Sequence, residues 1–169
     1  ENLARAAEVG SASHISFTPS LFRLLLMVSG ETRLGRIPLR QVTFGGEATD
    51  QTALDSARRI WPAARITHVY ASTDFGDILS VSDGVAGVPA AMFERPPFSF
   101  AADGELLIGG KPTQDLWRES RGRYHFVGRT QEMINIGGHK ISPVEVEAAA
   151  LQLDGVEGAV AYGVPSALL

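Results

Sequence analysis

The 169-residue sequence contains no cysteine, and its only lysines are Lys111 and Lys140. Without cysteine the protein can form no disulfide, no cysteine nucleophile and no thiolate metal site. No run of about 20 apolar residues is present, and the chain does not start with a cationic segment followed by an apolar core. We therefore expect a soluble, cytoplasmic protein without a membrane partner.

An excess of positive charge is also lacking. The formal net charge is -4 at pH 7, so the composition gives no sign of nucleic-acid binding, although backbone amides can still hold a nucleotide. No G-x-G-x-x-G motif follows a strand pattern, which disfavours a dinucleotide enzyme. The remaining composition, 44% hydrophobic and 20% charged, is typical of one globular domain or of one domain plus a fragment.

Helical and strand patterns alternate in the first half of the sequence. This alternation predicts an α/β fold with a parallel sheet, in which ligands lie beyond the carboxyl ends of the strands. The glycine pair that follows residue 44 and the polar stretch that follows residue 70 both belong at that edge. The predicted elements are a helix at 3–9, a strand at 14–17, a helix from Thr18 to Gly30, a strand at 40–44, a helix capped by Asp50 at 51–60, and strands at 65–70 and 77–82.

The second half favours a β-rich subdomain followed by a helix. Ser142 is a good N-cap, Pro143 suits the first helical position, and Glu145 has the spacing of a capping box, so a helix is predicted from Ser142 to about Leu153. The other predicted elements are strands at 104–109, 124–127 and 156–164, with an irregular Pro-rich run at 89–97.

The segment GRTQEMINIGGHKISPVEVE, residues 128–147, is similar to the segment that joins the large and small domains of the adenylate-forming superfamily. That family includes acyl- and aryl-CoA synthetases, luciferases and non-ribosomal peptide synthetase adenylation domains. The resemblance extends over essentially the whole chain. It implies that residues 1–128 are the C-terminal part of the large AMP-binding domain, with a parallel-sheet portion and a β-rich subdomain. Residues 129–169 would then be the hinge and the beginning of a small α+β domain.

The segment VYASTDFGD resembles the family's tyrosine, glycine, any residue, threonine, glutamate motif, with Ala71 in place of the glycine and Asp74 in place of the glutamate. The resemblance implies that Tyr70 stacks on adenine, and that Thr73 and Asp74 are catalytic, contacting phosphate and magnesium respectively. A hydroxyl, a carboxylate and an aromatic face suit those three roles. Because aspartate is one methylene shorter, a water between it and the ion is an alternative. Gly45, Gly46 and Glu47 would line the adenine.

The segment KPTQDL, residues 111–116, resembles a splice of two family loops. By resemblance Asp115 holds the ribose hydroxyls, as an ionised carboxylate accepting two donors can, although Gln114 replaces a glycine. Arg129 contacts the ribose of ATP or of the adenylate, and Gln131 is the hinge. The shortened joins predict missing chain between about Gly110 and Asp115, and a second gap near residues 93–101.

The resemblance implies that a carboxylate and ATP react to give an acyl adenylate and pyrophosphate, after which the acyl group passes to the thiol of coenzyme A or of a carrier-protein phosphopantetheine arm. Magnesium would assist. The family's phosphate loop and late catalytic lysine are not found in the sequence, so a non-catalytic nucleotide-binding or interaction module is the alternative.

Each site residue also has a structural interpretation: the glycines as a turn, Tyr70 as a half-buried strand residue, Asp74 as a turn former and Asp115 as a surface carboxylate.

Overall fold

The computed structural model describes residues 2–156 and 158–165, which fall into two units, Glu1–Ala86 and Gly87–Leu169. A mixed four-stranded sheet organises the first unit, in the order β1-β2-β3-β4. β1, β2 and β3 are parallel, and β4 returns antiparallel beside β3. The predicted parallel sheet is thus confirmed for three strands. Their bounds are β1 (His14–Phe17), β2 (Gln41–Phe44), β3 (Arg65–Ser72) and β4 (Gly76–Val81).

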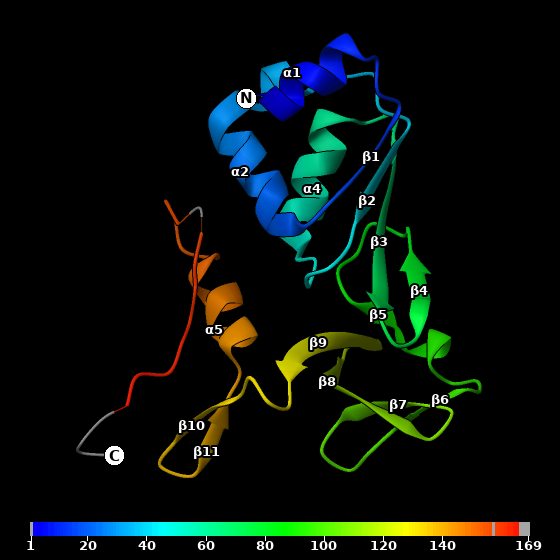
Figure 1. Ribbon diagram of the computed structural model, residues 1–169, viewed down its shortest axis with the longest axis vertical. Coiled ribbons are helices and arrows are strands. Elements are labelled where there is room, and N and C mark those ends of the chain that lie inside the picture. Colours follow the sequence, from blue (N-terminus) through cyan, green and yellow to red (C-terminus); the bar gives the residue numbers. More distant parts are fainter. Residues whose placement is uncertain (1, 157, 166–169) are drawn as a thin grey trace. The chain divides into compact units, whose positions relative to one another are not determined.

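Four helices accompany this sheet: α1 (Asn2–Val9), α2 (Pro19–Ser29), α3 (Glu31–Leu34) and α4 (Gln51–Ile60). Figure 1 shows α2 and α4 on one side of β1, β2 and β3. The rings of Phe17, Phe22 and Phe44 lie 5.1–5.3 Å apart between these layers, and all three are buried. Burial of aromatic surface on the helix side therefore joins the sheet to α2, and the buried apolar residues of α4 belong to the same core.

The predicted helix starts of the first unit are confirmed at the level of atoms. Thr18 Oγ1 accepts a hydrogen bond from the backbone N–H of Leu21 at 3.2 Å, and Asp50 Oδ1 accepts one from Ala53 at 3.0 Å. Gly30 ends α2 with a positive φ of 71°, which a glycine adopts without strain. No helix in the described part of the chain has the length and apolar character needed to cross a bilayer.

The second unit contains a five-stranded antiparallel half-barrel in the order β5-β9-β8-β7-β6. Phe93 is the centre of its aromatic core, with the rings of Phe98, Phe100, Trp117 and Tyr124 at 5.2–5.5 Å. The elements are β5 (Val88–Pro89), the 3-10 turn η1 (Ala90–Met92), β6 (Phe98–Phe100), β7 (Glu105–Ile108), β8 (Lys111–Ser120) and β9 (Arg123–Arg129).

The chain is short between Gly110 and Asp115, where the sequence predicts missing chain, and that expectation stays a prediction. Gly109 and Gly110, with φ of 59° and 76°, form a two-residue turn of the kind that glycines favour in hairpins, and Ile108 pairs with Lys111 across it. β8 then continues without interruption to Ser120. Residues 93–101, where a second gap is expected, include the buried Phe93 and β6. Hairpin pairing and aromatic packing hold these two segments in the half-barrel.

The end of the described chain forms the hairpin β10 (Ile134–Ile136) and β11 (His139–Ile141), followed by α5 (Pro143–Ala150). Ser142 is the N-cap, as predicted, and accepts from the backbone N–H of Glu145 at 3.0 Å. The capping box is wrong, because the Glu145 carboxylate pairs with the Arg118 guanidinium instead. α5 also ends at Ala150, earlier than predicted.

The strand predicted at 156–164 is also wrong for the residues that are described there, Val156 and 158–164, because none of them is in a strand; Glu157 lies outside the described residues. A strand is stabilised by a ladder of hydrogen bonds to a neighbouring strand. Here the backbone N–H of Ala161 instead donates to Glu147 Oε1 of α5, at 2.9 Å. Side-chain contact with the helix replaces sheet pairing in this segment.

Candidate functional site

The two glycines after β2 are required by the backbone. A Cβ at Gly45 would lie 2.9 Å from Val69 Cγ2 of β3, and Gly46 has a φ of 78°. The first glycine therefore permits a close approach to the neighbouring strand, and the second permits a left-handed turn. Both lie beyond the carboxyl end of β2, at the sheet edge where ligands are expected in such folds.

Glu47 makes a helix-capping contact rather than remaining an open carboxylate. Its Oε2 accepts hydrogen bonds from the Ser20 backbone N–H at 3.0 Å and from Ser20 Oγ at 2.6 Å. A carboxylate placed beside the first turn of α2 is favoured by the unpaired N–H groups and the helix dipole. The contact fixes the loop after Gly46 against α2.

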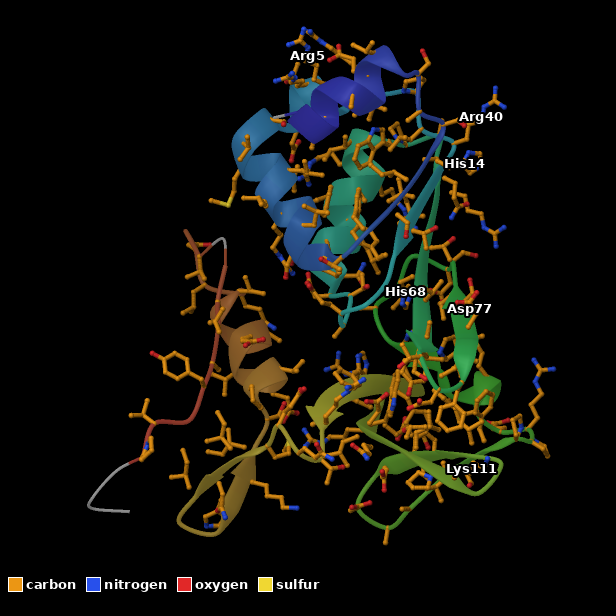
Figure 2. The ribbon with its side chains drawn as sticks, in the orientation of Figure 1. Arg5, His14, Arg40, His68, Asp77 and Lys111 are labelled. Atoms are coloured by element: carbon orange, nitrogen blue, oxygen red, sulfur yellow. The ribbon has the colours of Figure 1, made fainter. Side chains whose placement is uncertain are left out.

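Tyr70 lies half-buried on β3, opposite Leu79 of β4, next to a register shift between residues 70 and 71. The predicted turn begins later than expected, because Ala71 and Ser72 continue β3. Thr73 and Asp74 are exposed in the turn that joins β3 to β4. Figure 2 shows His14 of β1 and Arg40, the residue before β2, toward the other end of the sheet from Asp77 of β4.

The magnesium role of Asp74 can be tested against the residues around it. Within the described ranges, no group of three or more His, Cys, Asp or Glu side chains is arranged to hold a metal. Mg²⁺ commonly keeps several waters and binds through one or two carboxylates together with the phosphates of a substrate. One exposed carboxylate at the carboxyl edge of the sheet fits that pattern and does not fit an all-protein metal cage.

Asp115 and Arg129 form a cross-strand pair on β8 and β9. The Asp115 side chain is only 4% exposed and that of Arg129 is 54% exposed, and Arg129 Nε lies 3.2 Å from Asp115 Oδ1. The backbone N–H of Asp115 also donates to Thr113 Oγ1 at 3.2 Å. A buried carboxylate needs a charged or hydrogen-bonded partner, and Arg129 supplies one. The surface-carboxylate interpretation of Asp115 is therefore wrong.

Sequence reasoning did not identify the contacts of Gln114 around this pair. Its carbonyl oxygen accepts from the Thr130 backbone N–H at 2.9 Å, and its side-chain Oε1 accepts from Gln131 Nε2 at 2.9 Å. The sequence signal that was available was the replacement of a glycine by glutamine next to Asp115. It could not show which residues Gln114 would contact, because Thr130 and Gln131 are distant along the chain.

The predicted site residues thus form two groups. Gly45, Gly46, Glu47, Tyr70, Thr73 and Asp74 belong to the first unit, and Asp115 and Arg129 belong to the second. The fold brings the glycine loop beside β3 in one unit and joins the carboxylate to the guanidinium in the other. Convergence of both groups on one nucleotide stays a prediction.

Comparison with curated proteins finds relatives that include a peptide synthase and several ligases. Tyrocidine synthase 3 of Brevibacillus parabrevis is 27% identical over 205 residues, which cover 95% of this chain and 3% of that protein. Because the aligned stretch exceeds the 169 residues of this chain, the relative has positions without a counterpart here. The 3,4-dihydroxybenzoate–[aryl-carrier protein] ligase of Bacillus anthracis is 44% identical over 50 residues, covering 30% of this chain and 12% of the ligase.

Solved structures share the fold. The amide bond synthetase McbA of Marinactinospora thermotolerans matches with a TM-score of 0.72 and 20% identity, over 98% of this chain and 42% of that one. MenE of E. coli with bound OSB-AMS matches with a TM-score of 0.70 and 21% identity, over 94% of this chain and 39% of that one. This chain therefore spans less than half the length of these solved structures. No family model matches it.

Proposed function

This chain belongs to the adenylate-forming superfamily, of whose members it spans only a part, and from that premise we propose that the full-length protein activates a carboxylic acid with ATP. The products of this step are an acyl or aryl adenylate and pyrophosphate. The acyl group then passes to a thiol, either of coenzyme A or of a carrier-protein phosphopantetheine arm. We propose that this chain supplies the groups that contact adenosine.

The observation that carries the proposal is the buried Asp115 carboxylate beside the half-exposed Arg129. A fixed carboxylate accepts hydrogen bonds from the two hydroxyls of a ribose, and each bond is charge-assisted. Arg129 holds the carboxylate in place from the neighbouring strand and presents its guanidinium to solvent, where a ribose would lie. Burial of Asp115 fixes the carboxylate and lowers the local dielectric, which strengthens the hydrogen bonds that it accepts.

The first unit supplies the other proposed contacts. Tyr70 stacks on adenine, and the backbone of Gly45 and Gly46 lines its edge. Thr73 donates its hydroxyl to a phosphate oxygen. Asp74 would hold the magnesium ion directly or through a water, and that ion, when bound, supplies positive charge to the transferring phosphoryl group. Glu47 keeps the glycine loop in place through its contact with Ser20.

The acceptor thiol and the domain division also belong to the proposal. Two relatives carry names that state an acceptor: the aryl-carrier protein ligase of Bacillus anthracis and the oxalate–CoA ligase of Arabidopsis thaliana. We propose an acceptor of one of these two kinds for this protein. We also propose that residues 1–128 act with the large domain and that 129–169 are the hinge and the beginning of the small domain, with the change of orientation at Gln131.

Carboxylate-dependent exchange of labelled pyrophosphate into ATP by the full-length protein tests the proposal. The parent should catalyse exchange with at least one acid of an aliphatic and aromatic panel, and Asp115→Ala should reduce it at least tenfold, because two charge-assisted hydrogen bonds of roughly 1.5 kcal/mol or more each are lost. Gln152→Ala, an exposed change after α5, is the matched control. Nucleotide binding without exchange for any acid would favour the non-catalytic module.

A further inference from the structure

Gln114 has a backbone conformation that glutamine rarely adopts. Its φ is 65°, in the left-handed region where a side chain is strained and glycine is not. It lies inside β8, immediately before Asp115. Such a conformation persists only where surrounding contacts stabilise it, and it is often found at functional sites.

The strand is bulged at this point. Leu107 of β7 pairs with Pro112 of β8, and Glu105 pairs with Leu116. Three residues of β8, numbers 113–115, therefore lie opposite a single residue of β7. A bulge of this kind bends the strand and changes the direction of nearby side chains. Here the bulge contains Asp115, whose carboxylate meets Arg129 of β9.

Gln114 is held in this bulge by hydrogen bonds to both sides. Its backbone N–H donates to Glu105 Oε1 at 2.7 Å, and its carbonyl accepts from the backbone N–H and from Oγ1 of Thr130, at 2.9 and 3.2 Å. Its side-chain Oε1 accepts from Gln131 Nε2 at 2.9 Å. The backbone contacts would survive replacement by glycine, whereas the contact with Gln131 belongs to the glutamine side chain.

We infer that Gln114 and Gln131 are positioning residues, whose side-chain hydrogen bond holds the turn after Arg129 against β8 and so keeps the Arg129 guanidinium on the Asp115 carboxylate. The inference rests on the proposed function for its ligand, because the positioned pair is the one assigned to the ribose. A purely structural role predicts something different. Glycine at 114 would then only relieve strain and leave the neighbouring pair unchanged.

The test uses the full-length protein with four single variants and one double variant. Gln131→Ala and Gln114→Gly each remove the side-chain hydrogen bond, whereas Gln131→Glu replaces the donor by an acceptor, to which the Gln114 side-chain NH2 can donate once its amide is reversed. Gln152→Ala is the control, and the double variant combines Gln114→Gly with Gln131→Ala. Three quantities are measured: hydrogen exchange of the Arg129 Nε–H by nitrogen-15 NMR without ligand, AMP affinity by calorimetry, and the urea midpoint.

The inference predicts faster exchange of the Arg129 Nε–H in both single deletions and AMP binding weaker by roughly threefold to tenfold, the effect of losing one neutral hydrogen bond. The double variant should lose no more than either single variant, since both delete the same bond. Gln131→Glu and Gln152→Ala should match the parent. Gln114→Gly should keep or raise the urea midpoint because glycine relieves the strain at φ 65°, so weaker binding cannot then be ascribed to unfolding.

The positioning role would be overturned if hydrogen exchange of the Arg129 Nε–H were unchanged in both Gln131→Ala and Gln114→Gly. Additive losses of AMP affinity in the double variant would also overturn it. Failure of the proposed function has a different signature. If the parent does not bind AMP while its Arg129 exchange still responds to both deletions, the ribose assignment fails and the positioning of Arg129 on Asp115 is retained. If AMP binds equally well to the parent and to both deletions, the positioning inference fails and nucleotide binding is retained.

Discussion

The Ser142 hydroxyl donates a hydrogen bond to the Val127 carbonyl of β9 while accepting one from the backbone N–H of Glu145 in α5. A single side chain, 1% exposed, therefore both caps the helix and joins it to the half-barrel. The chain passes from β9 through the β10–β11 hairpin to α5 between these two contacts. This buried hydroxyl thus adds to the Arg118–Glu145 ion pair in holding α5 against the half-barrel.

Ser142→Ala should lower the free energy of unfolding by about 1–3 kcal/mol, because it removes an N-cap and leaves the buried Val127 carbonyl without this donor. Glu145→Gln is the matched control. It should cost at most about 1 kcal/mol, since the ion pair with Arg118 is well exposed on both sides. Urea denaturation of both variants measures the difference. Equal losses would show that Ser142 does not have the double role seen here.

Gly45→Ala should disturb the loop that carries Gly46 and Glu47, because the new Cβ would lie 2.9 Å from Val69 Cγ2. We expect a loss of about 1–3 kcal/mol from this overlap. Val69→Ala removes the opposing methyl groups, so the double variant should be more stable than the sum of the two single effects predicts. A thermodynamic cycle by urea denaturation tests the contact, and additive losses would contradict it.

His125 gives the second unit a pH dependence of known sign. Partial desolvation, and secondarily the charge of Arg123, lowers the pKa of the exposed His125 below its ordinary value of 6.5. As the pH falls, the unfolded chain binds a proton on this imidazole at a higher pH than the folded protein does. The contribution of His125 to the free energy of unfolding is therefore full above the ordinary pKa, and it is lost as the pH falls through that value toward the lower pKa of the folded state. His125→Gln should flatten this decrease between about pH 8 and pH 5. An identical pH profile for the parent and the variant would contradict the assignment.

The helix starts were predictable from sequence because their signals are local. Thr18, Asp50 and Ser142 cap helices through backbone N–H groups only three residues away, so residue type and spacing suffice. The capping box of Glu145 failed for the opposite reason. Its carboxylate has an alternative partner, Arg118 on β8, and a residue 27 positions away in the sequence is not part of the local pattern.

The candidate site shows the same limit. Sequence motifs selected Asp115 and Arg129 separately, and the antiparallel pairing of β8 with β9 makes them neighbours. The bulge at Gln114 could not be predicted, because glutamine seldom has a positive φ and only the contacts with Glu105, Thr130 and Gln131 stabilise it. The predicted strand at 156–164 failed because a strand pattern does not supply a pairing partner.

Calorimetric titration of the full-length protein with AMP and with Mg-ATP tests the central claim most directly. Asp115→Ala should weaken binding of both ligands at least roughly tenfold, because both contain the ribose and lose its charge-assisted hydrogen bonds. Asp74→Ala should weaken Mg-ATP binding and leave AMP affinity nearly unchanged, since AMP needs no metal bridge between its phosphates. Equal losses for both ligands in both variants, or a parent protein that binds neither nucleotide, would contradict the account.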